Sequence, residues 1–556
     1  MAEEKLMDKL VALCRRKGFI FQSSEIYGGI NGFWDYGPLG VELKRNIKDA
    51  WWLDMVRNPP LGPDGREVQM VGVDCSIVMN PKVWEASGHV GGFSDPMVDC
   101  KKCRRRFRGD KVFFLRFTRP TGLLYMGGYE ADNKSDAAQL IADQMAKLVK
   151  RREQAGLVEQ YQRGEYEIIS ALELFDVQKQ KHEASIIPQP GTLGAGLCPA
   201  PGCGGDLTAP RAFNLMFQTY VGAVQDEGNI AYLRPETAQG IFVNFRNVLD
   251  SARVKVPFGI AQVGKAFRNE INPRNYTFRS REFEQMEIEF FCHPSESMKW
   301  YEWWRDVRIE WYSHLGIRSE RLRPREQGGD ELAFYSKATT DIEYLFPFSD
   351  EPQELEGVAH RGAYDLSQHR KHSGRDLTYF DEEAWERDKA NRGTNSFKEW
   401  LKKSPPQSEI EKYQYVPHVI EPSAGADRFT LAVLCEAYTE DVVKGEPRTV
   451  MKFHPRLAPI KAAILPLVNK DGMPEKAEAL YRQLKRRFNV YYDDGGAIGR
   501  RYRRQDEIGT PFCITVDGDT MKDGTVTIRE RDSTEQERIN IEAVEDYLRA
   551  KLEPQG

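Results

Sequence analysis

The sequence predicts an α+β domain built on an antiparallel sheet, interrupted by an insertion and followed by a separate α/β domain. Between residue 210 and about residue 300, turns separate short apolar or alternating runs such as AFNLMF, GIFVNF and REFEQMEIEFF, which is typical of antiparallel strands. Residues 96–209 hold four of the nine cysteines, two of them in a Gly/Pro-rich stretch, and we interpret them as the insertion. From about residue 456, strand-like KAAILPLV and NVYYDD alternate with helix-like KAEALYRQLKRRF, which indicates an α/β domain.

Size and composition limit the class of protein. A chain of 556 residues is too long for one ordinary domain, and 40% apolar residues suit a globular chain with large cores. The 79 basic and 84 acidic residues give a net charge of −5, which argues against a protein that simply coats a polyanion. No stretch approaches the roughly 18 apolar residues needed to cross a bilayer, and no secretory signal precedes the first helix. We expect a cytoplasmic protein with reduced cysteines and no membrane association.

Other segments can be assigned in chain order. Residues 41–56 place Leu43, Ile47, Trp51 and Met55 on one helical stripe, which predicts either a core-facing helix or a subunit interface. Residues 132–185 predict charged helices, and the polar residues 384–415 predict a surface insertion. The stretch HVIEPSAGADRFTLAVLCEAY predicts a strand, a glycine turn and a buried helix.

Residues 267–287 carry the strongest chemical signal. Charged Arg268, Glu270, Arg279 and Glu287 alternate with aromatic residues in a sheet that should be mostly buried. An exposed charged hairpin is the simpler interpretation. Buried charges, however, are costly unless they are paired or bind a ligand, so a site for an anionic ligand would explain them.

This stretch resembles motif 2 of the class II aminoacyl-tRNA synthetases. Residues 41–81 resemble motif 1, about 258–291 motif 2, and about 418–438 motif 3, where Gly425 precedes Asp427 and Arg428. The stretches VWEASGHVGGFSDPM, RPETAQGIF, ELEGVAHRGAYDL and VPHVIEPSAGADR narrow the resemblance to the homodimeric glycine-specific members. It implies a catalytic core over 1–95 and 210–455, the insertion over 96–209, and an anticodon-binding domain over 456–556.

The resemblance implies a two-step reaction. Glycine attacks ATP to give glycyl-adenylate and pyrophosphate, and the glycyl group then passes to the 3′ end of tRNA(Gly). Arg268 matches the arginine at the α-phosphate, Arg428 the one at the γ-phosphate, and Phe283 the aromatic under adenine. Glu270 matches the acid at the adenine edge, and Glu354 an acid near ATP, acting through Mg²⁺. The full predicted ATP site is Arg268, Asn269, Glu270, Phe278, Arg279, Phe283, Glu354, Leu355, Gly425, Asp427 and Arg428, with Arg268, Arg428 and Glu270 as catalytic residues.

Glycine offers only an ammonium and a carboxylate, so its pocket should be small and acidic. Glu236, Glu287, Glu421 and Ser423 match the glycine-contacting positions of the family, and Arg108 a substrate-contacting arginine. A surface salt bridge is the simpler interpretation for any single glutamate, but three glutamates in three separate motifs favour the pocket. Because every competing amino acid is larger, steric exclusion suffices and no editing domain is expected.

The cysteines predict a second site. Cys100-x2-Cys103 and Cys198-x4-Cys203 are spaced for a structural Cys₄ zinc ribbon, and the alternative is a metal-free cluster of reduced thiols.

The resemblance also implies partners. The C-terminal domain would bind tRNA, and the run Arg500 to Arg504 around Tyr502 would either contact RNA or form a solvated turn. Motif 1 makes the dimer interface in this class, so the stripe on 41–56 is a candidate contact in a homodimer.

One position departs from the family pattern. Ala363 stands where an aspartate is expected, which lessens the expectation of full activity without affecting the fold. The rival functions are a non-catalytic synthetase-like accessory or nucleic-acid-binding protein, and a synthetase for another small amino acid. The retained arginines disfavour the first, and the three glutamates disfavour the second.

Overall fold

The computed structural model divides the chain into two compact units. The first unit combines Met1–Ser87, Gln218–Arg268 and Arg274–Gly556, and the second combines Gly88–Phe217 with Asn269–Pro273. Within them the structure describes residues 6–119, 122–131, 134–151, 155–174, 198–328, 332, 336–443 and 445–552.

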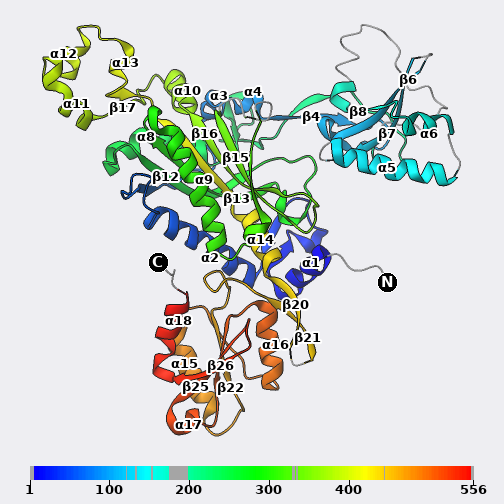
Figure 1. Ribbon diagram of the computed structural model, residues 1–556, viewed down its shortest axis with the longest axis vertical. Coiled ribbons are helices and arrows are strands. Elements are labelled where there is room, and N and C mark those ends of the chain that lie inside the picture. Colours follow the sequence, from blue (N-terminus) through cyan, green and yellow to red (C-terminus); the bar gives the residue numbers. More distant parts are fainter. Residues whose placement is uncertain are drawn as a thin grey trace. The chain divides into compact units, whose positions relative to one another are not determined.

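A seven-stranded sheet forms the centre of the first unit (Figure 1). Every neighbouring pair is antiparallel except the last, in which β12 and β3 run parallel. The predicted antiparallel architecture is therefore confirmed. The run GIFVNF, predicted as one of its strands, instead lies in helix α8 (Ala238–Ala252), where Ile241, Phe242 and Phe245 form one buried helical face. In spatial order the strands are β14 (Leu322–Glu326), β15 (Ala338–Tyr344), β16 (Gln353–Gly362), β19 (His418–Gly425), β13 (Glu282–Cys292), β12 (Phe258–Phe267) and β3 (Gln69–Gly72).

Alternation along β13 gives the sheet two chemically different faces. Met286, Ile288 and Phe290 belong to the main apolar core, whereas Glu287 and Glu289 lie between them and point to the other face. One face of the sheet therefore holds the core and the other carries acids.

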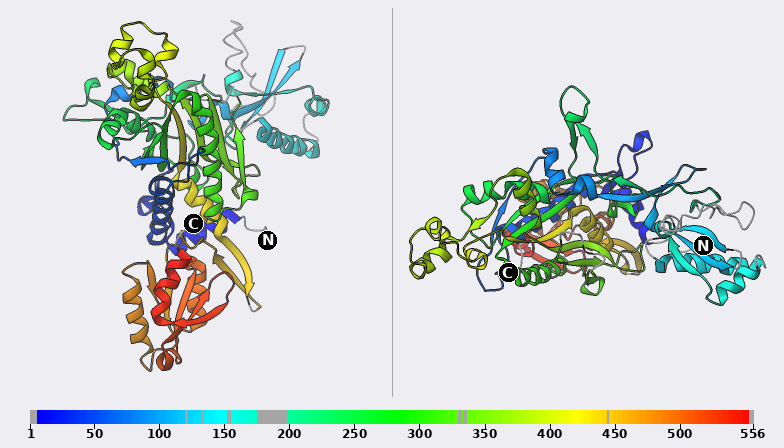
Figure 2. Two further views of the ribbon diagram at one scale, coloured as in Figure 1. Left: turned by 60° about the vertical axis from the view of Figure 1, so that its left-hand side comes forward. Right: turned by 90° about the horizontal axis from the view of Figure 1, so that it is seen from above.

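Helices cover the apolar face. These are α1 (Leu6–Lys17), α2 (Pro38–Trp52), α9 (Ser297–His314) and α14 (Ala426–Ala437). Helix α9 contributes Trp300, Trp304 and Tyr312 to the core. The helix lies along the strands of the sheet (Figure 2). The core also contains the sequence-predicted stripe of Leu43, Ile47, Trp51 and Met55, on α2 and the short π-helix Leu53–Arg57. All four side chains are buried within the chain, so the interface interpretation of this stripe is wrong and the core interpretation is right.

Two helices cover the acidic face. Helix α8 (Ala238–Ala252) packs Ile241, Phe242 and Phe245 against Phe258 and Phe291 of the sheet. Leu366 of α10 (Tyr364–Ser373) joins this second core. The acids of the sheet thus lie next to an apolar layer, where bulk water does not screen them.

Smaller elements complete this part of the first unit. They are β1 (Ile20–Gln22), β2 (Trp34–Tyr36), α3 (Pro81–Ala86), β10 (Gln218–Tyr220), β11 (Ile230–Tyr232), β17 (Tyr379–Phe380), α11 (Glu382–Asp388), α12 (Phe397–Leu401), α13 (Gln407–Ile410), β18 (Gln414–Tyr415), β20 (Tyr438–Val443) and β21 (Glu446–Met451). Residues 384–415, predicted as a surface insertion, form helices α11 to α13 around a small core of Trp385, Trp400 and Tyr413.

The C-terminal residues form a second sheet, coloured orange to red in Figure 1. Its order is β23 (Val490–Tyr492), β22 (Ala462–Pro466), β24 (Phe512–Val516), β25 (Thr525–Glu530) and β26 (Gln536–Asn540), with β22 parallel to both of its neighbours. The helices are α15 (Met473–Leu484), α16 (Ile498–Ile508), α17 (Thr520–Asp523) and α18 (Val544–Leu552). This is the predicted α/β alternation, built around its own apolar core.

The second unit contains two small antiparallel sheets. One has the order β5 (Arg106–Arg108), β4 (Ser94–Asp99) and β9 (Arg211–Asn214), and the other β7 (Gly122–Glu130), β6 (Val112–Arg119) and β8 (Glu167–Ser170). The helices are α4 (His89–Gly92), α5 (Lys134–Arg151) and α6 (Ala155–Gln162). The prediction that 132–185 is helical is therefore only partly right, because β8 follows α6 and closes a sheet over the helices. Residues 175–185 of that prediction lie outside the described residues.

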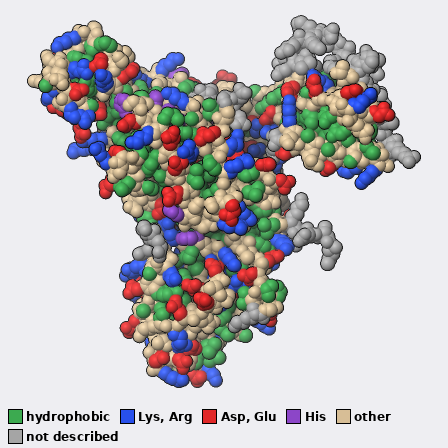
Figure 3. Space-filling view, in the orientation of Figure 1, with side chains coloured by type: hydrophobic (Ala, Val, Ile, Leu, Met, Phe, Trp, Pro, Cys, Tyr) green, Lys and Arg blue, Asp and Glu red, His purple; other side chains and the backbone are tan. Residues whose placement is uncertain are grey.

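The surface fits the small net charge. Figure 3 shows acidic and basic side chains interspersed over the face in view. None of the helices that the structure describes has the length and apolar character required to cross a membrane.

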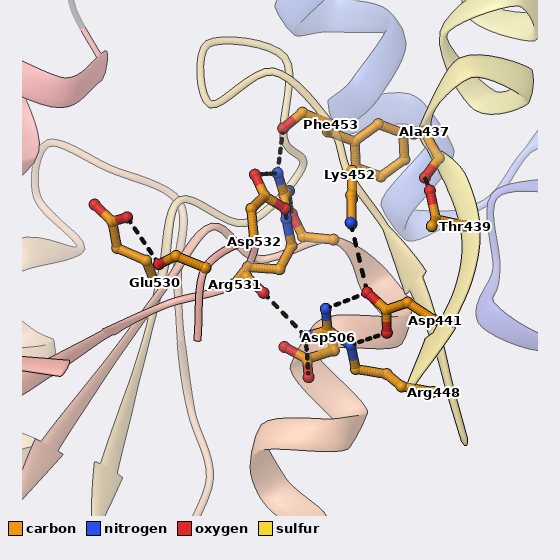
Figure 4. A network of polar contacts seen from close by, with 12 residues as sticks. Ala437, Thr439, Asp441, Arg448, Lys452, Phe453, Asp506, Glu530, Arg531 and Asp532 are labelled. Atoms are coloured by element: carbon orange, nitrogen blue, oxygen red, sulfur yellow. Dashed lines mark hydrogen bonds and ion pairs between the residues drawn. The ribbon is translucent and has the colours of Figure 1, made fainter. Parts of the chain in front are cut away.

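A buried ionic network joins the hairpin β20–β21 to the C-terminal domain (Figure 4). Arg448 of β21 binds Asp441 through Nε and Nη2 at 2.7 and 2.6 Å, and Asp506 of α16 through Nη1 at 3.1 Å. Arg529 of β25 binds both oxygens of Asp506 at 2.8 and 3.1 Å. The negative charge of Asp506 thus faces the positive charges of two buried arginines.

Removal of this carboxylate should be costly, because it leaves the buried Arg529 without its acidic partner and takes one of two from Arg448. We expect Asp506→Asn to lower the free energy of unfolding by about 3–5 kcal/mol, measured from urea-unfolding midpoints. The exposed Asp519 beside Lys522 is the matched control, and Asp519→Asn should change stability by about 0.5 kcal/mol or less. Equal effects of the two substitutions would contradict a stabilising role for the network.

Candidate functional site

Four sequence-predicted residues meet on the acidic face of the sheet. Carboxylate oxygens of Glu287 and Glu421 lie within 4.8 Å of one another, together with one of Glu289. The Gln285 amide donates to Ser423 at 3.2 Å and to Glu287 at 3.5 Å. Glu236 approaches the same group through Arg361, at 3.9 Å. The structure therefore brings the predicted residues Glu236, Glu287, Glu421 and Ser423 together in one acidic cluster, which we call the acidic pocket.

Arg361 holds the pocket together. It is buried at the end of β16 and binds both oxygens of Glu421 at 2.9 Å. It also binds both oxygens of Asp365, four residues later in α10, at 2.8 and 3.0 Å. The planar guanidinium suits this double bidentate contact, which fixes β16, β19 and α10 against one another.

A hydrogen bond from Gln239 orients Glu236, and Gln239 is itself held by Asp365 and His369. Gln239 of α8 donates its amide hydrogens to Glu236 and to Asp365, both at 2.9 Å. Its carbonyl oxygen lies 2.8 Å from Nε2 of His369. Since the Gln239 amide nitrogen serves two carboxylates, its oxygen must accept, and His369 must carry its proton on Nε2. Burial lowers the pKa of His369, which keeps the ring neutral.

Burial and the proximity of other acids raise the pKa of two of these glutamates. Burial, and then Glu236, raise the pKa of Glu287. Burial raises the pKa of Glu421 well above its ordinary value, although Arg361 opposes the shift. Such a pocket would gain free energy from a small cation, because a ligand ammonium supplies the missing positive charge.

Among the residues predicted to bind ATP, three arginines surround one acid, Glu354. Nε of Arg428 donates to the Phe278 carbonyl at 3.2 Å, and Nη1 lies 3.2 Å from the Glu354 carboxylate. Arg428 lowers the pKa of Glu354 against the effect of burial, and Arg268 and Arg279 lower it further. Three half-buried arginines near one partly exposed carboxylate form a site for a polyanion.

Arg268 is positioned for such a ligand by two contacts. Its Nε donates to the Pro235 carbonyl at 3.0 Å, and its guanidinium carbon lies 5.3 Å from the centre of the Phe283 ring. Phe283 occupies the same face of β13 as Glu287 and is half-buried, so part of the ring is open to a ligand.

Three further residues that were predicted to bind ATP have side chains that pack in the core or bond to other elements of the fold. Phe278 packs on Phe346 and Phe348, and Leu355 is buried in the main core. Asp427 accepts from the Tyr36 hydroxyl at 2.6 Å, from Lys44 at 2.8 Å and from the Glu284 N–H at 2.7 Å. These contacts use the carboxylate to tie α2 and β13 to α14, and the ATP contact predicted for Asp427 stays a prediction. Gly425 precedes the first residue of α14 and lies beside Arg428.

Three predicted residues belong to the second unit. Arg108 pairs with Asp95 at 3.1 Å and with Asp110 at 2.8 Å, and the nearby Glu270 also raises its pKa. The Asn269 backbone N–H donates to the Leu215 carbonyl at 2.7 Å. The substrate contacts predicted for these residues stay predictions.

The four predicted cysteines converge in the second unit. Sγ of Cys100 lies 3.6 Å from Sγ of Cys203, and Sγ of Cys103 lies 3.7 Å from Sγ of Cys198. A tetrahedral site with zinc–sulfur bonds of about 2.3 Å requires sulfur separations of about 3.8 Å, so the four thiols fit this geometry.

Two other sequence features have a structural explanation. Ala363 precedes the first residue of α10 and provides no side-chain cap, whereas an aspartate is a favoured residue at this position. In the basic run on α16, Arg501 is buried and donates to the carbonyls of Pro466, Leu467 and Asp493. The Tyr502 hydroxyl lies 2.6 Å from the Thr515 hydroxyl. Neither the RNA nor the solvated-turn interpretation therefore describes Arg501, which has a structural role.

Sequence reasoning missed several residues of the pocket. Glu289, Gln239 and His369 received no role, although all three are buried beside the predicted glutamates. Glu289 lies two residues after Glu287 on a strand, so the period-2 rule could have placed both on one face. For Gln239 and His369 the sequence holds no such signal, because their contact joins two helices.

Comparison with known proteins gives consistent matches. Residues 219–494 match the tRNA synthetase class II core domain (G, H, P, S and T), and residues 461–551 match the anticodon binding domain. The chain is similar to the glycine–tRNA ligase of Rhodopirellula baltica, with 50% identity over 98% of this chain and 99% of the relative. It is also similar to the glycine–tRNA ligases of Clostridium perfringens, with 47% identity, and Clostridium beijerinckii, with 46%, each over 100% of both chains.

Proposed function

The chain belongs to the glycine–tRNA ligase family, and on this premise we propose which of its residues bind each substrate. The protein is an aminoacyl-tRNA synthetase that activates glycine with ATP and transfers the glycyl group to tRNA(Gly). The single observation that supports the residue assignment is the link between the two clusters: Arg268 of the arginine cluster donates to the carbonyl of Pro235, the residue before Glu236 of the acidic pocket.

We propose that the acidic pocket binds glycine. Glu236 and Glu421 retain some exposed side-chain surface, and Glu287, which retains almost none, forms the floor. The ammonium would contact these carboxylates, and the Ser423 hydroxyl would help to orient the ligand. A larger amino acid would have to displace side chains that Arg361 and Gln285 hold in place, which supports steric selection of glycine.

We propose that the arginine cluster binds ATP. Arg268 would hold the α-phosphate and stabilise the charge that develops as pyrophosphate leaves, and Arg428 would hold the γ-phosphate. Adenine would stack on Phe283. Glu354, with Asp341 close enough to be affected by its charge, offers carboxylate oxygens for Mg²⁺, which would neutralise phosphate charge. Phe278, Leu355 and Asp427 would support these residues from behind.

The ATP assignment is tested by ATP–pyrophosphate exchange with glycine, alanine or serine. We expect exchange with glycine alone, and a fall of about 10²–10³-fold in Arg268→Ala, because a donor aimed at the transition state is lost. Arg246→Ala on α8, which removes an exposed arginine paired with Asp250, should leave the exchange rate unchanged.

Undiminished exchange in Arg268→Ala would remove this residue from the α-phosphate site. A folded protein without exchange would implicate Ala363 instead, and Ala363→Asp should then restore activity.

We propose that Cys100, Cys103, Cys198 and Cys203 hold a structural zinc ion, since four thiolates leave no open position for catalysis. Elemental analysis of the purified protein should give about one zinc per chain, and Cys103→Ser should lose it. Cys292→Ser, at a buried cysteine outside the cluster, should retain the metal. Equal zinc content in the two variants would contradict the site.

We also propose that the protein forms a homodimer. We propose further that it is located in the cytoplasm, together with its substrates tRNA and ATP. Because the α2 stripe is buried, the contact must use another surface. Neighbouring Ile26 and Tyr27 are 88% and 86% exposed, which is unusual for large apolar side chains and supports a contact there.

Sedimentation velocity should show a dimer that dissociates when Ile26 and Tyr27 are both changed to Ser. The control is Val442→Ser, at an exposed apolar residue of β20. A variant that stays dimeric would exclude this surface, and a monomeric wild-type protein would contradict the dimer.

A further inference from the structure

Glu289 is a buried acid that the proposed reaction does not use. Its side chain is 0% exposed, compared with 7% for Glu421, so no ligand reaches it from the pocket as the pocket stands. Neither carboxyl oxygen has a hydrogen-bond partner among the described residues. Across the strand pair it faces Ile260, which offers no polar side-chain atom.

The groups that surround Glu289 are mostly negative. Glu287 comes from its own strand, Glu421 from β19 and Asp365 from α10, and Arg361 is the one cation among the groups that shift its ionisation. The guanidinium of Arg361 already binds Glu421 and Asp365. Each neighbouring carboxylate thus has a donor, from Arg361 for Glu421 and from Thr237 and Gln285 for Glu287, whereas Glu289 has none.

An ionised Glu289 would be an unpaired charge in an apolar environment beside other negative charges. Both conditions favour the protonated acid. Burial, and then the charge of Glu421, raise the pKa of Glu289 well above its ordinary value. Burial also raises the pKa of Glu421 and Glu287, but hydrogen-bond donors oppose the shift in both, whereas Glu289 has no such donor in the part of the chain that the structure describes. The geometry therefore favours Glu289 as the member of the cluster that carries a proton.

We propose that Glu289 is a positioning residue of the glycine pocket, which remains an uncharged carboxylic acid and donates its hydrogen to Glu421 or Glu287 when glycine is bound. This inference rests on the proposed glycine pocket. The neutral acid keeps a further negative charge out of the cluster, and its hydrogen would hold the receiving carboxylate in the orientation that meets the ammonium.

Glutamine has nearly the same shape as protonated glutamate and can donate a hydrogen bond, but it cannot ionise. We therefore expect Glu289→Gln to keep the KM for glycine within about twofold of wild type in ATP–pyrophosphate exchange. Glu289→Met, which removes the donor, should raise this KM by about tenfold and change kcat less. The matched control is Glu421→Gln, which removes a charge proposed to contact the ammonium, and its KM should rise by at least about tenfold.

The outcomes are distinct. A large rise in KM for Glu289→Gln, equal to that for Glu421→Gln, would show that Glu289 acts as a charged ligand contact and would overturn the proposal. An unchanged KM in Glu421→Gln would instead overturn the glycine pocket itself, and this inference with it. An unchanged KM in Glu289→Met would exclude the positioning role.

Thermal unfolding gives a second readout that does not depend on activity. An acid whose pKa is raised by folding loses stability as the pH rises above its unfolded value of about 4.3 and up to its folded value. Glutamine has no such loss, so the Tm of Glu289→Gln relative to wild type should increase between about pH 5 and about pH 8. The same substitution at exposed Glu227 should give no such trend. A Tm difference that stays constant or falls as the pH rises over this range would show that folding does not favour the protonated form of Glu289, which would overturn the proposal.

Discussion

The position of each side chain around the catalytic sheet depends on the register of β13 between β12 and β19. In this register Glu287 lies opposite Gln262 on one side and Ser423 on the other. Because side chains alternate, a slip of one residue would move Glu287 and Glu289 into the tryptophan-rich core under α9. It would also expose Met286 and Ile288 to the pocket. The large free-energy cost of such an exchange fixes the register and, with it, the site.

Buried charges follow from that arrangement, and many of those in the described residues are paired with an opposite charge. Arg308 of α9 binds both oxygens of Glu356 at 2.8 and 3.0 Å, and Lys44 of α2 binds Asp427 at 2.8 Å and Glu284 at 2.7 Å. These pairs lie between elements that are distant in sequence. They add little net stability compared with an apolar core, but each allows only one arrangement of its elements. In the proposed glycine pocket, by contrast, several acids surround Arg361, which binds Glu421 and Asp365.

This imbalance connects structure with function. If the proposed pocket binds glycine, the ammonium of the substrate would supply the positive charge that the ligand-free protein lacks there, and part of the electrostatic cost of the site would be removed only on binding. The arginine cluster shows the opposite imbalance, with Arg268, Arg279 and Arg428 around Glu354, and the phosphates of ATP would balance it. The two halves of the site thus match the two charged substrates of the first reaction step.

The sequence alone predicted the architecture and several of the residues that meet on one face of the sheet. Turn-bounded alternating runs predicted the antiparallel sheet, strand–helix alternation predicted the C-terminal domain, and three motifs named the residues that meet around β13. It could not decide which members of a motif face the ligand. Asp427 and Phe278 stand in motifs beside Arg428 and Arg279, yet both face inward.

Only the tertiary structure decided how each polar side chain is used, because a side chain's role depends on partners from other elements. The α2 stripe would suit a subunit interface or a core equally well, and burial against the chain's own tryptophans selected the core. Arg501 lies in a basic run yet serves three backbone carbonyls. Glu289 differs from Glu287 only in lacking a donor. Periodicity is local and can be read along the chain, whereas the pairing of buried charges is set by contacts between distant residues, and only the folded structure specifies them.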